Sequence, residues 1–473
     1  MQQAPSVTID RVGWRKPGFA LLVGTAVAAV GAGLLATALE RPEVGLAVVV
    51  GVLGGALVGY LMLNRFEAFL SVMLVIRPLL DLTKGTQAGT LDLTVLTGMG
   101  MVAATVWWLW FNRHPVGERQ ASPLTAALIA FGLVSLLAIP GSELPMTAFA
   151  EVSRLLSGVL LFLVCDTMLA RGVPIRRLLT SILVAAILPI FVPLIGPAVG
   201  IEVYHFKDGI RALRSTFFLS NNFAHFLAPF IVLGVAFIGN LRGPRRVLLL
   251  AILALAFTEL VLAVTRGAWL AVLTGILVIG LVHNRRLLLV AVFVSALAFA
   301  FVPAVNERVT DLVGDPSAPR SQSSLAWRLD HWSAIVSLSK DTPLLGIGPG
   351  MTNVLSQNEK APHSDYVRSY VETGVLGLLA YISVIVSMLY VGWLAIGRSE
   401  EAHRPAALGV FAFSCGFAVA SLAENLITTV SFLWFVMPML AIVNRLAYPP
   451  KAPGGIGWIS AEVEAPAVLS SRR

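Results

Sequence analysis

Charged side chains are scarce in this chain. Asp, Glu, Lys and Arg together make up 13% of the 473 residues, whereas soluble domains contain about 25%. Hydrophobic residues make up 57%, and long apolar runs recur along almost the whole sequence. This composition excludes an ordinary soluble protein, and the length of the runs favours membrane-spanning helices over the alternating strands of a barrel. The lipid bilayer is therefore the first predicted partner.

Cysteine is also rare. Cys165 and Cys415 are the only two, and both lie in apolar segments, so no disulfide framework is expected. The net charge of +8 would suggest nucleic acid in a soluble protein. In a membrane protein, however, Lys and Arg collect in the cytoplasmic loops, and we expect no nucleic-acid partner. The first apolar run is too long for the core of a signal peptide, and we interpret it as the first span.

The apolar runs predict an all-α integral membrane protein, a polytopic bundle of 12 to 14 transmembrane helices. A helix needs roughly 20 residues to cross a bilayer. The segment 66–80 is shorter and contains Glu67 and Arg77, so it is either a tilted or a re-entrant helix. The expected spans are 18–39, 44–63, 66–80, 91–111, 122–139, 146–169, 178–199, 217–239, 246–264, 267–283, 287–303, 367–395, 406–423 and 427–446.

The distribution of basic residues predicts the orientation. With the N-terminus inside, the inner loops receive most of the Lys and Arg, and the outer turns 40–43 and 140–145 hold one and none. We therefore expect a multi-pass protein of the cytoplasmic (inner) membrane with both termini cytoplasmic. The predicted divisions are a cytoplasmic N-terminus (1–17), transmembrane helices with an outer loop at 200–216 (18–303), a large extracytoplasmic loop (304–366), C-terminal transmembrane helices (367–446) and a disordered cytoplasmic tail (447–473).

Several arginines on the predicted outer face break this pattern. Arg211 and Arg214 lie in the loop 200–216, and Arg328 lies in the large loop. Arg266 lies in the tight outer turn VTRGAW. Long loops cross a membrane regardless of their charge, which accounts for the large loop better than for Arg266. Positive charge on the outer face, where the general rule expects little, predicts an anionic ligand on this face.

Polar residues crowd the start of one late span, where 361–378 reads APHSDYVRSYVETGVLGL. Ser364 or Asp365 can cap the helix that follows, which places His363 beside a helix N-terminus at the outer boundary of the membrane. Tyr366 and Tyr370 share one helical face below it. An ordinary interfacial belt of His and Tyr is the alternative interpretation.

Further polar residues occur in or near other spans. Arg328 and Trp332 are four residues apart, on one helical face. The span 217–239 contains three polar residues, Asn221, Asn222 and His225. Such side chains cost free energy inside a membrane unless they face a cavity or each other. The remaining intramembrane charges are an expected Glu151–Arg154 packing pair and two acids with no assigned role, Glu259 and Glu424.

Together these motifs resemble the O-antigen ligase-like superfamily, the membrane glycosyltransferases that include lipopolysaccharide O-antigen ligases and Wzy-type polymerases. The matching pieces are RSTFFLSNN, TRGAWL, PLLGIGPG, and His363-Ser364 followed after nine residues by Gly-x-x-Gly. Arg266 and Leu270 also fit an Arg-x-x-x-Leu element associated with ligases. The chain departs from the family where serine follows His363 and where Ser-Asn-Asn replaces Asn-Pro-Asn. The resemblance covers about 210–385 and favours a ligase, with a polymerase left open.

The resemblance implies an inverting transfer of glycan from a polyprenyl-diphosphate carrier to the hydroxyl of a lipid or glycan acceptor on the outer face. It implies catalytic roles for His363, Arg266 and Arg214. The arginines would stabilise the diphosphate leaving group, and His363 would act as a base or as a hydrogen-bond donor to the diphosphate. No DxD or paired-carboxylate motif is found on the outer face, so we expect no metal and no cofactor. The expected substrate-binding residues are Arg211, Asn221, Asn222, Arg328, Trp332, Tyr366 and Tyr370.

Three other classes stay open at this point. A transporter or flippase of a lipid-linked glycan or other anion fits the number of spans, although the chain has no visible inverted repeat. An enzyme of the peptidoglycan polymerase type would use an acid of the large loop, with Asp311, Asp315 and Asp330 as the candidates. A structural scaffold would not need arginines and a histidine at the outer boundary.

Overall fold

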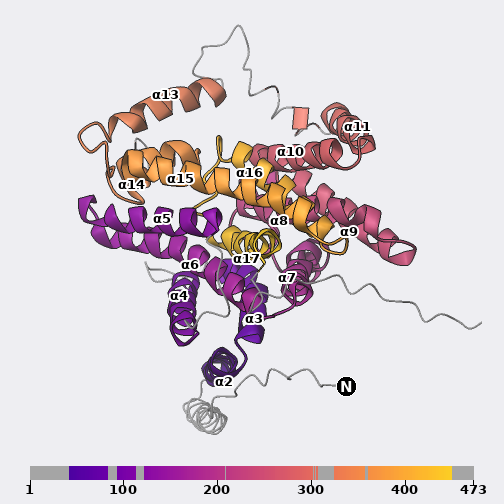
Figure 1. The fold of residues 1–473 in the computed structure, drawn as a ribbon, viewed down its shortest axis with the longest axis horizontal. Helices are drawn as coiled ribbons and strands as arrows, with labels where there is room; N and C mark the ends of the chain where they lie inside the picture. The colour runs from indigo at the N-terminus through magenta and orange to yellow at the C-terminus, as the bar shows by residue number, and fades with distance from the viewer. Residues whose placement is uncertain are drawn as a thin grey trace, which may run out of the picture.

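A computed structural model describes residues 42–83, 93–112, 122–207, 209–301, 324–356 and 361–449, with single positions between 303 and 310. This part of the chain is mostly helical (Figure 1), which confirms the predicted fold class. Its helices are α2 (Pro42–Asn64), α3 (Phe66–Leu80), α4 (Leu93–Phe111), α5 (Pro123–Leu137), α6 (Pro145–Ala170), α7 (Ile175–Ile195), α8 (Ser220–Phe237), α9 (Pro244–Leu262), α10 (Arg266–Val282), α11 (Arg286–Phe301), α13 (Ser324–Ser337), α14 (Met351–Leu355), α15 (Asp365–Arg398), α16 (Arg404–Ala420) and α17 (Val430–Ala447), with four 3-10 turns at Asp81–Thr83, Ile139–Gly141, Gly196–Val199 and Ile238–Asn240.

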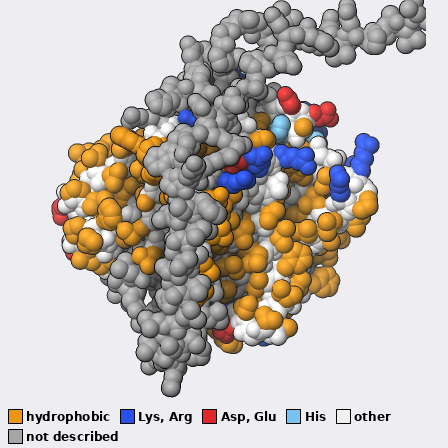
Figure 2. Space-filling model, turned by 90° about the horizontal axis from the view of Figure 1, so that it is seen from below, with side chains coloured by type: hydrophobic (Ala, Val, Ile, Leu, Met, Phe, Trp, Pro, Cys, Tyr) orange, Lys and Arg blue, Asp and Glu red, His pale blue; other side chains and the backbone are white. Residues whose placement is uncertain are grey.

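Six helical segments in the described residues are long and apolar enough to cross a membrane: Pro123–Gly141, Pro145–Ala170, Ile175–Val199, Ser220–Asn240, Asp365–Arg398 and Val430–Ala447. Four shorter apolar helices accompany them. The protein is therefore an integral membrane protein with several spans. Much of the visible surface is hydrophobic, with basic side chains gathered toward one end (Figure 2). The total of 12 to 14 spans stays a prediction, because the expected first span (18–39), the N-terminus (1–17) and most of the expected tail (447–473) lie outside the described residues.

The predicted outer loop 200–216 contains a β-hairpin, which the all-helical interpretation did not anticipate. Strand β1 (Tyr204–Lys207) pairs antiparallel with β2 (Ile210–Leu213), and Tyr204 lies opposite Leu213. Gly209 takes a positive φ of 79° at the turn, a conformation that glycine adopts without steric cost. The hairpin gives the loop a fixed shape directly before α8.

Helix α17 occupies the centre of the bundle (Figure 1). It packs against α6 and α15, and its side chains are almost completely buried, including Trp434 and Phe435. Polar contacts fix it to α6, because the Trp434 indole donates to Ser157 (3.1 Å) and Arg445 pairs with Asp166. A membrane helix surrounded by protein in this way tolerates such polar anchors, since they find partners inside the bundle.

Helix α15 is broken near its start, and a glycine-rich loop fills the break. Gly374 has φ 69° and ψ −167°, a conformation almost restricted to glycine. The amides of Ile347 and Gly348 donate to the carbonyls of Val371 and Glu372, both at 3.0 Å, and other loop carbonyls accept amides from beyond the break. The backbone of the GIGPG sequence therefore lies close to the backbone of the Gly-x-x-Gly motif, and the two segments are hydrogen-bonded to each other.

We expect Gly374→Ala to destabilise the protein by about 3 kcal/mol or more, because alanine is strained in this conformation. A Cβ at this position would also lie 2.2 Å from the backbone of Leu344. Thermal unfolding of the purified protein in detergent measures the effect. Gly397→Ala near the other end of α15 is the matched control, because its Cβ would meet nothing within 4 Å. Equal unfolding temperatures for the two variants would show that the break tolerates a side chain.

Candidate active site

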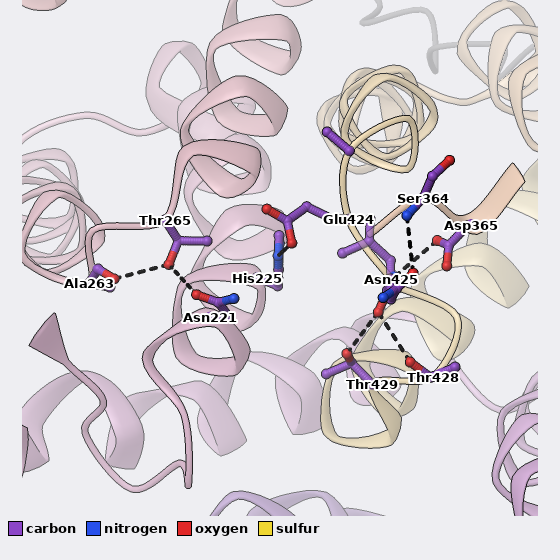
Figure 3. Close-up of polar contacts among 12 residues, drawn as sticks. Asn221, His225, Ala263, Thr265, Ser364, Asp365, Glu424, Asn425, Thr428 and Thr429 are labelled. Carbon is purple, nitrogen blue, oxygen red and sulfur yellow. Dashed lines mark hydrogen bonds and ion pairs between the residues drawn. The ribbon is translucent and has the colours of Figure 1, made fainter. Parts of the chain in front are cut away.

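Four helices begin at the same end of the bundle, and their first residues meet there. The Thr265 hydroxyl before α10 donates to the Asn221 side chain of α8 (3.1 Å). The Ser364 amide before α15 donates to the side chain of Asn425 in the loop before α17 (3.2 Å; Figure 3). Helix N-termini carry partial positive charge and unpaired N–H groups, so this end of the bundle favours an anion.

Glu424 lies at the centre of this region, between α8 and the loop before α15 (Figure 3). Its side chain is buried, and its carboxylate lies 3.6 Å from Nε2 of His225, an ion-pair distance that is too long for a good hydrogen bond. It also packs against the backbone of α10, where a Cβ at Gly267 would lie 2.3 Å from Cγ of Glu424. Burial by itself raises the pKa of Glu424, but His225, His363 and Arg328 outweigh it and hold the pKa below its ordinary value. The carboxylate is therefore ionised at neutral pH.

The loop that carries Glu424 is held by Asp365, the first residue of α15. The Asp365 carboxylate accepts the backbone N–H groups of Leu426 (3.0 Å) and Ile427 (3.3 Å). In turn, the Asp365 amide donates to the carbonyl of Ser421 (2.9 Å). These contacts tie the start of α15 to both sides of Glu424, and so fix the carboxylate relative to His363.

His363 lies in the short segment before α15 and is held by α13, which lies beside the first part of α15 (Figure 1). The Trp332 indole donates to the carbonyl of Pro362 (2.6 Å), and Nε2 of His331 lies 3.3 Å from the carbonyl of Ala361. Burial lowers the pKa of His363 below its ordinary value; Glu424 opposes this effect, and the positive charge of Arg328 adds to it. The imidazole is therefore mostly neutral at pH 7 and able to accept a proton.

Three cationic side chains surround these groups. The Lys207 ammonium of β1 donates to the Asn221 side chain and to the carbonyl of Val264 (3.2 Å). The Arg328 guanidinium of α13 donates to the carbonyl of Ala423 (2.9 Å), directly before Glu424. Arg266 is the first residue of α10. Burial lowers the pKa of Arg328, Glu424 opposes this effect, and the charge of Arg266 adds to it. The three positive charges thus lie on β1, α10 and α13, which are far apart in sequence.

Backbone strain is concentrated at this end of the protein. Among the described non-glycine residues, Ser215, Val264 and His363 have positive φ values of 51°, 50° and 50°. This conformation is unfavourable for most side chains, and especially for a β-branched residue such as Val264. One strained residue follows Arg214, one lies two positions before Arg266, and the third is His363 itself. Strain of this kind persists where the surrounding structure enforces it, which is typical of functional sites.

The structure brings together five of the predicted site residues: His363, Arg266, Arg328, Asn221 and Trp332. Tyr366 lies at the edge, in the first turn of α15, and its hydroxyl donates to the carbonyl of Ala418 in α16 (3.1 Å). The hairpin arginines point elsewhere. Arg214 donates to the backbone and side chain of Glu202 at 3.2–3.4 Å, and Arg211 lies over the ring of Tyr204. Asn222 and Tyr370 are half-buried on their helices. Arg214 lies near His205 instead, and the pKa of His205 is lowered first by burial and then by the charge of Arg214.

Two groups at the site had no assigned role in the sequence, Glu424 and Lys207. Glu424 carried a usable signal, because an acid within an apolar stretch is costly unless it faces a partner or a cavity. Lys207 carried none, because one lysine in a predicted loop is ordinary. His225 was noted only as a polar residue in a span, and its pairing with Glu424 joins residues about 200 positions apart.

One part of the chain matches a known protein family. Residues 249–382 match the family model described as O-antigen ligase. Residues 249–382 thus form a domain that is similar to O-antigen ligases. This domain runs from α9 into α15, and it supplies Arg266, Arg328 and His363. Two other residues of the candidate site lie outside the matched residues: Lys207 on β1 and Glu424 before α17. No curated protein matches the chain.

Proposed function

We propose that this protein transfers a glycan from a polyprenyl-diphosphate carrier to an acceptor hydroxyl, as a ligase in preference to a polymerase. The convergence of Lys207, Arg266 and Arg328 around a neutral, half-buried His363 carries this proposal. A diphosphate needs cations and N–H donors, and an attacking hydroxyl needs a base. The charge of the loops supports a location of this site on the outer face of the cytoplasmic membrane.

The proposed reaction is a single displacement. The acceptor hydroxyl gives its proton to His363, and its oxygen forms a bond to the anomeric carbon of the glycan. The bond from that carbon to the diphosphate oxygen breaks, so the polyprenyl diphosphate leaves with the electron pair and the anomeric configuration inverts. Negative charge develops on the leaving oxygen, where Arg266, Arg328 and the converging helix N-termini stabilise it.

Glu424 has a supporting role in this scheme. Its ionised carboxylate partly balances the surrounding cations, and it stabilises the imidazolium that forms when His363 takes the proton. Its contact with the backbone at Gly267 also fixes its distance from the start of α10, where Arg266 lies. Glu424 therefore links the proposed base to the proposed diphosphate site.

The pH dependence separates the two possible roles of His363. If its neutral form is the base, the transfer rate is constant at neutral pH and falls on the acid side with a midpoint below about 6.5. Glu424→Gln removes a charge that raises the pKa of His363, so the midpoint moves to lower pH. Arg328→Gln removes a charge that lowers this pKa, so the midpoint moves to higher pH. A rate that instead falls as pH rises through the midpoint would assign His363 as a protonated donor.

The proposed transfer uses no metal ion. Incubation of the purified protein with EDTA is therefore expected to leave the transfer rate unchanged, within the error of the assay. A loss of activity that Mg²⁺ or Mn²⁺ restores would place the stabilisation of the diphosphate on a metal rather than on the arginines.

The decisive experiment is reconstitution of the purified protein with a lipid-linked glycan polymer and an acceptor glycolipid, with no ion gradient. A ligase attaches the whole polymer to the acceptor, whereas a polymerase lengthens the lipid-linked chain and leaves the acceptor bare. Movement of the glycan across the vesicle membrane without any new glycosidic bond would contradict the proposal and support a transporter.

A further inference from the structure

A second polar site lies between α3 and α7, on elements that contribute nothing to the candidate active site. A groove of about 460 Å³ opens here. Its lining combines hydroxyls (Ser71, Thr180, Ser181), arginines (Arg176, Arg177) and apolar side chains (Val75, Pro174, Val184). The Ser71 and Ser181 hydroxyls are hydrogen-bonded to each other at 2.8 Å, which joins the two helices within the groove. The site is therefore built by two packed helices rather than by a loose loop.

The charge of this groove is positive. Arg177 pairs with Glu67 of α3 at 2.7 Å, and both side chains remain well exposed. Within the described part of the chain, no ion pair or hydrogen bond is made by the side chain of Arg176, which is exposed at the first turn of α7. Two arginines and one glutamate leave an excess of one positive charge, together with three hydroxyl groups. This set matches a group with one negative charge and several oxygens, such as a phosphodiester.

The polar groove continues directly into an apolar surface. Beyond Val184, α7 exposes Ile187, Leu194 and Ile195 on the outside of the described bundle. The surface of α7 therefore has arginines at its start and exposed aliphatic side chains along its length. A phospholipid has the same order of groups, with a charged headgroup followed by apolar acyl chains. The headgroup occupies the groove, and the acyl chains follow the helix toward the membrane centre.

We propose that the α3–α7 groove binds the headgroup of an anionic phospholipid, with its phosphodiester on Arg176 and Arg177. Basic pockets between membrane helices are suited to such headgroups, and each basic residue near an anionic lipid surface contributes about a fivefold gain in affinity. Glu67 competes with the phosphate for Arg177. The site is independent of the proposed glycan transfer.

Native mass spectrometry of the full-length protein in detergent tests this site, with phosphatidylglycerol and phosphatidylcholine of equal acyl chains as probes. We expect the wild type to retain phosphatidylglycerol in preference. Arg176→Gln should weaken its binding about fivefold, and the Arg176→Gln/Arg177→Gln pair roughly 30-fold. Glu67→Gln should strengthen binding, because it frees Arg177 from its partner. Phosphatidylcholine carries the same phosphodiester but also a choline cation that offsets its charge, so its binding should change less than that of phosphatidylglycerol in each variant.

The matched control is Arg245→Gln/Arg246→Gln at the start of α9, which removes two exposed arginines at a helix start outside this groove. An equal loss in both double variants would overturn the proposal, because it would reflect net charge alone. Equal retention of the two lipids by the wild type would also overturn it. Should the double variant fold poorly, the opposite effects expected for Arg176→Gln and Glu67→Gln still decide the outcome.

Discussion

Replacement of His363 by alanine is expected to lower the rate of glycan transfer about 10³-fold, while the protein remains folded and membrane-inserted. The imidazole is held by its own strained backbone and by the contacts of α13 with Pro362 and Ala361, so few other groups can take its place. A positioned general base typically contributes 10²–10⁴-fold. Transfer by purified protein, measured at saturating lipid-linked glycan, gives the effect on the chemical step.

Two further variants show whether the loss is chemical. His363→Gln keeps a hydrogen-bonding side chain but removes the base, so it should be nearly as inactive as alanine. The control is His283→Ala, which should retain full activity. His283 is exposed and directly follows the C-terminal end of α10, the end away from Arg266. Full activity of His363→Ala would contradict the base assignment, and would favour an acid of the large loop such as Asp330 instead.

Arg266→Ala is expected to reduce transfer by about 10²–10³-fold, which is the usual cost of removing one donor to a developing oxyanion. Arg266 begins α10, so its removal takes a cation from a position where the helix already presents N–H groups to an anion. Arg266→Lys should recover little of the loss, because the ammonium lacks the planar fork that binds two phosphate oxygens at once. The same reconstituted assay measures both variants.

The control for this prediction is Arg285→Ala, which removes an exposed arginine after the far end of α10. We expect it to be close to wild type. Full activity of Arg266→Lys would argue against bidentate binding of the diphosphate. Arg214→Ala differs from Arg266→Ala, because Arg214 pairs with Glu202 in the structure. Its loss should therefore also destabilise the hairpin.

The helical architecture could be predicted from sequence because an apolar run of about 20 residues has few alternatives in a bilayer. The expected segment 427–446 corresponds to α17 at Val430–Ala447, and the short segment 66–80 corresponds to α3 with the same bounds. The hairpin at Tyr204–Lys207 and Ile210–Leu213 was missed, because two four-residue strands are too short to show periodicity.

The candidate site could be predicted only in part. His363, Arg266 and Arg328 carry local signals, such as arginine on the unexpected side of the membrane. The role of Glu424 depends on contacts that no local pattern contains, since its loop is tied to Asp365, some 60 residues earlier, and its carboxylate faces α8. Likewise, the sequence identifies the glycines of GIGPG only as part of the matching piece PLLGIGPG. Their exchange of hydrogen bonds with the break at Gly374 requires the folded arrangement.

The central claim is that the helix N-termini and cations around Glu424 hold a diphosphate beside His363. A structure of the full chain with polyprenyl diphosphate bound tests it most directly. We predict that the diphosphate lies at the starts of α8, α10 and α15, with its oxygens within hydrogen-bond distance of the Arg266 and Arg328 guanidinium groups. A diphosphate bound away from these residues, or on the side of the membrane where α10 ends, would contradict the account.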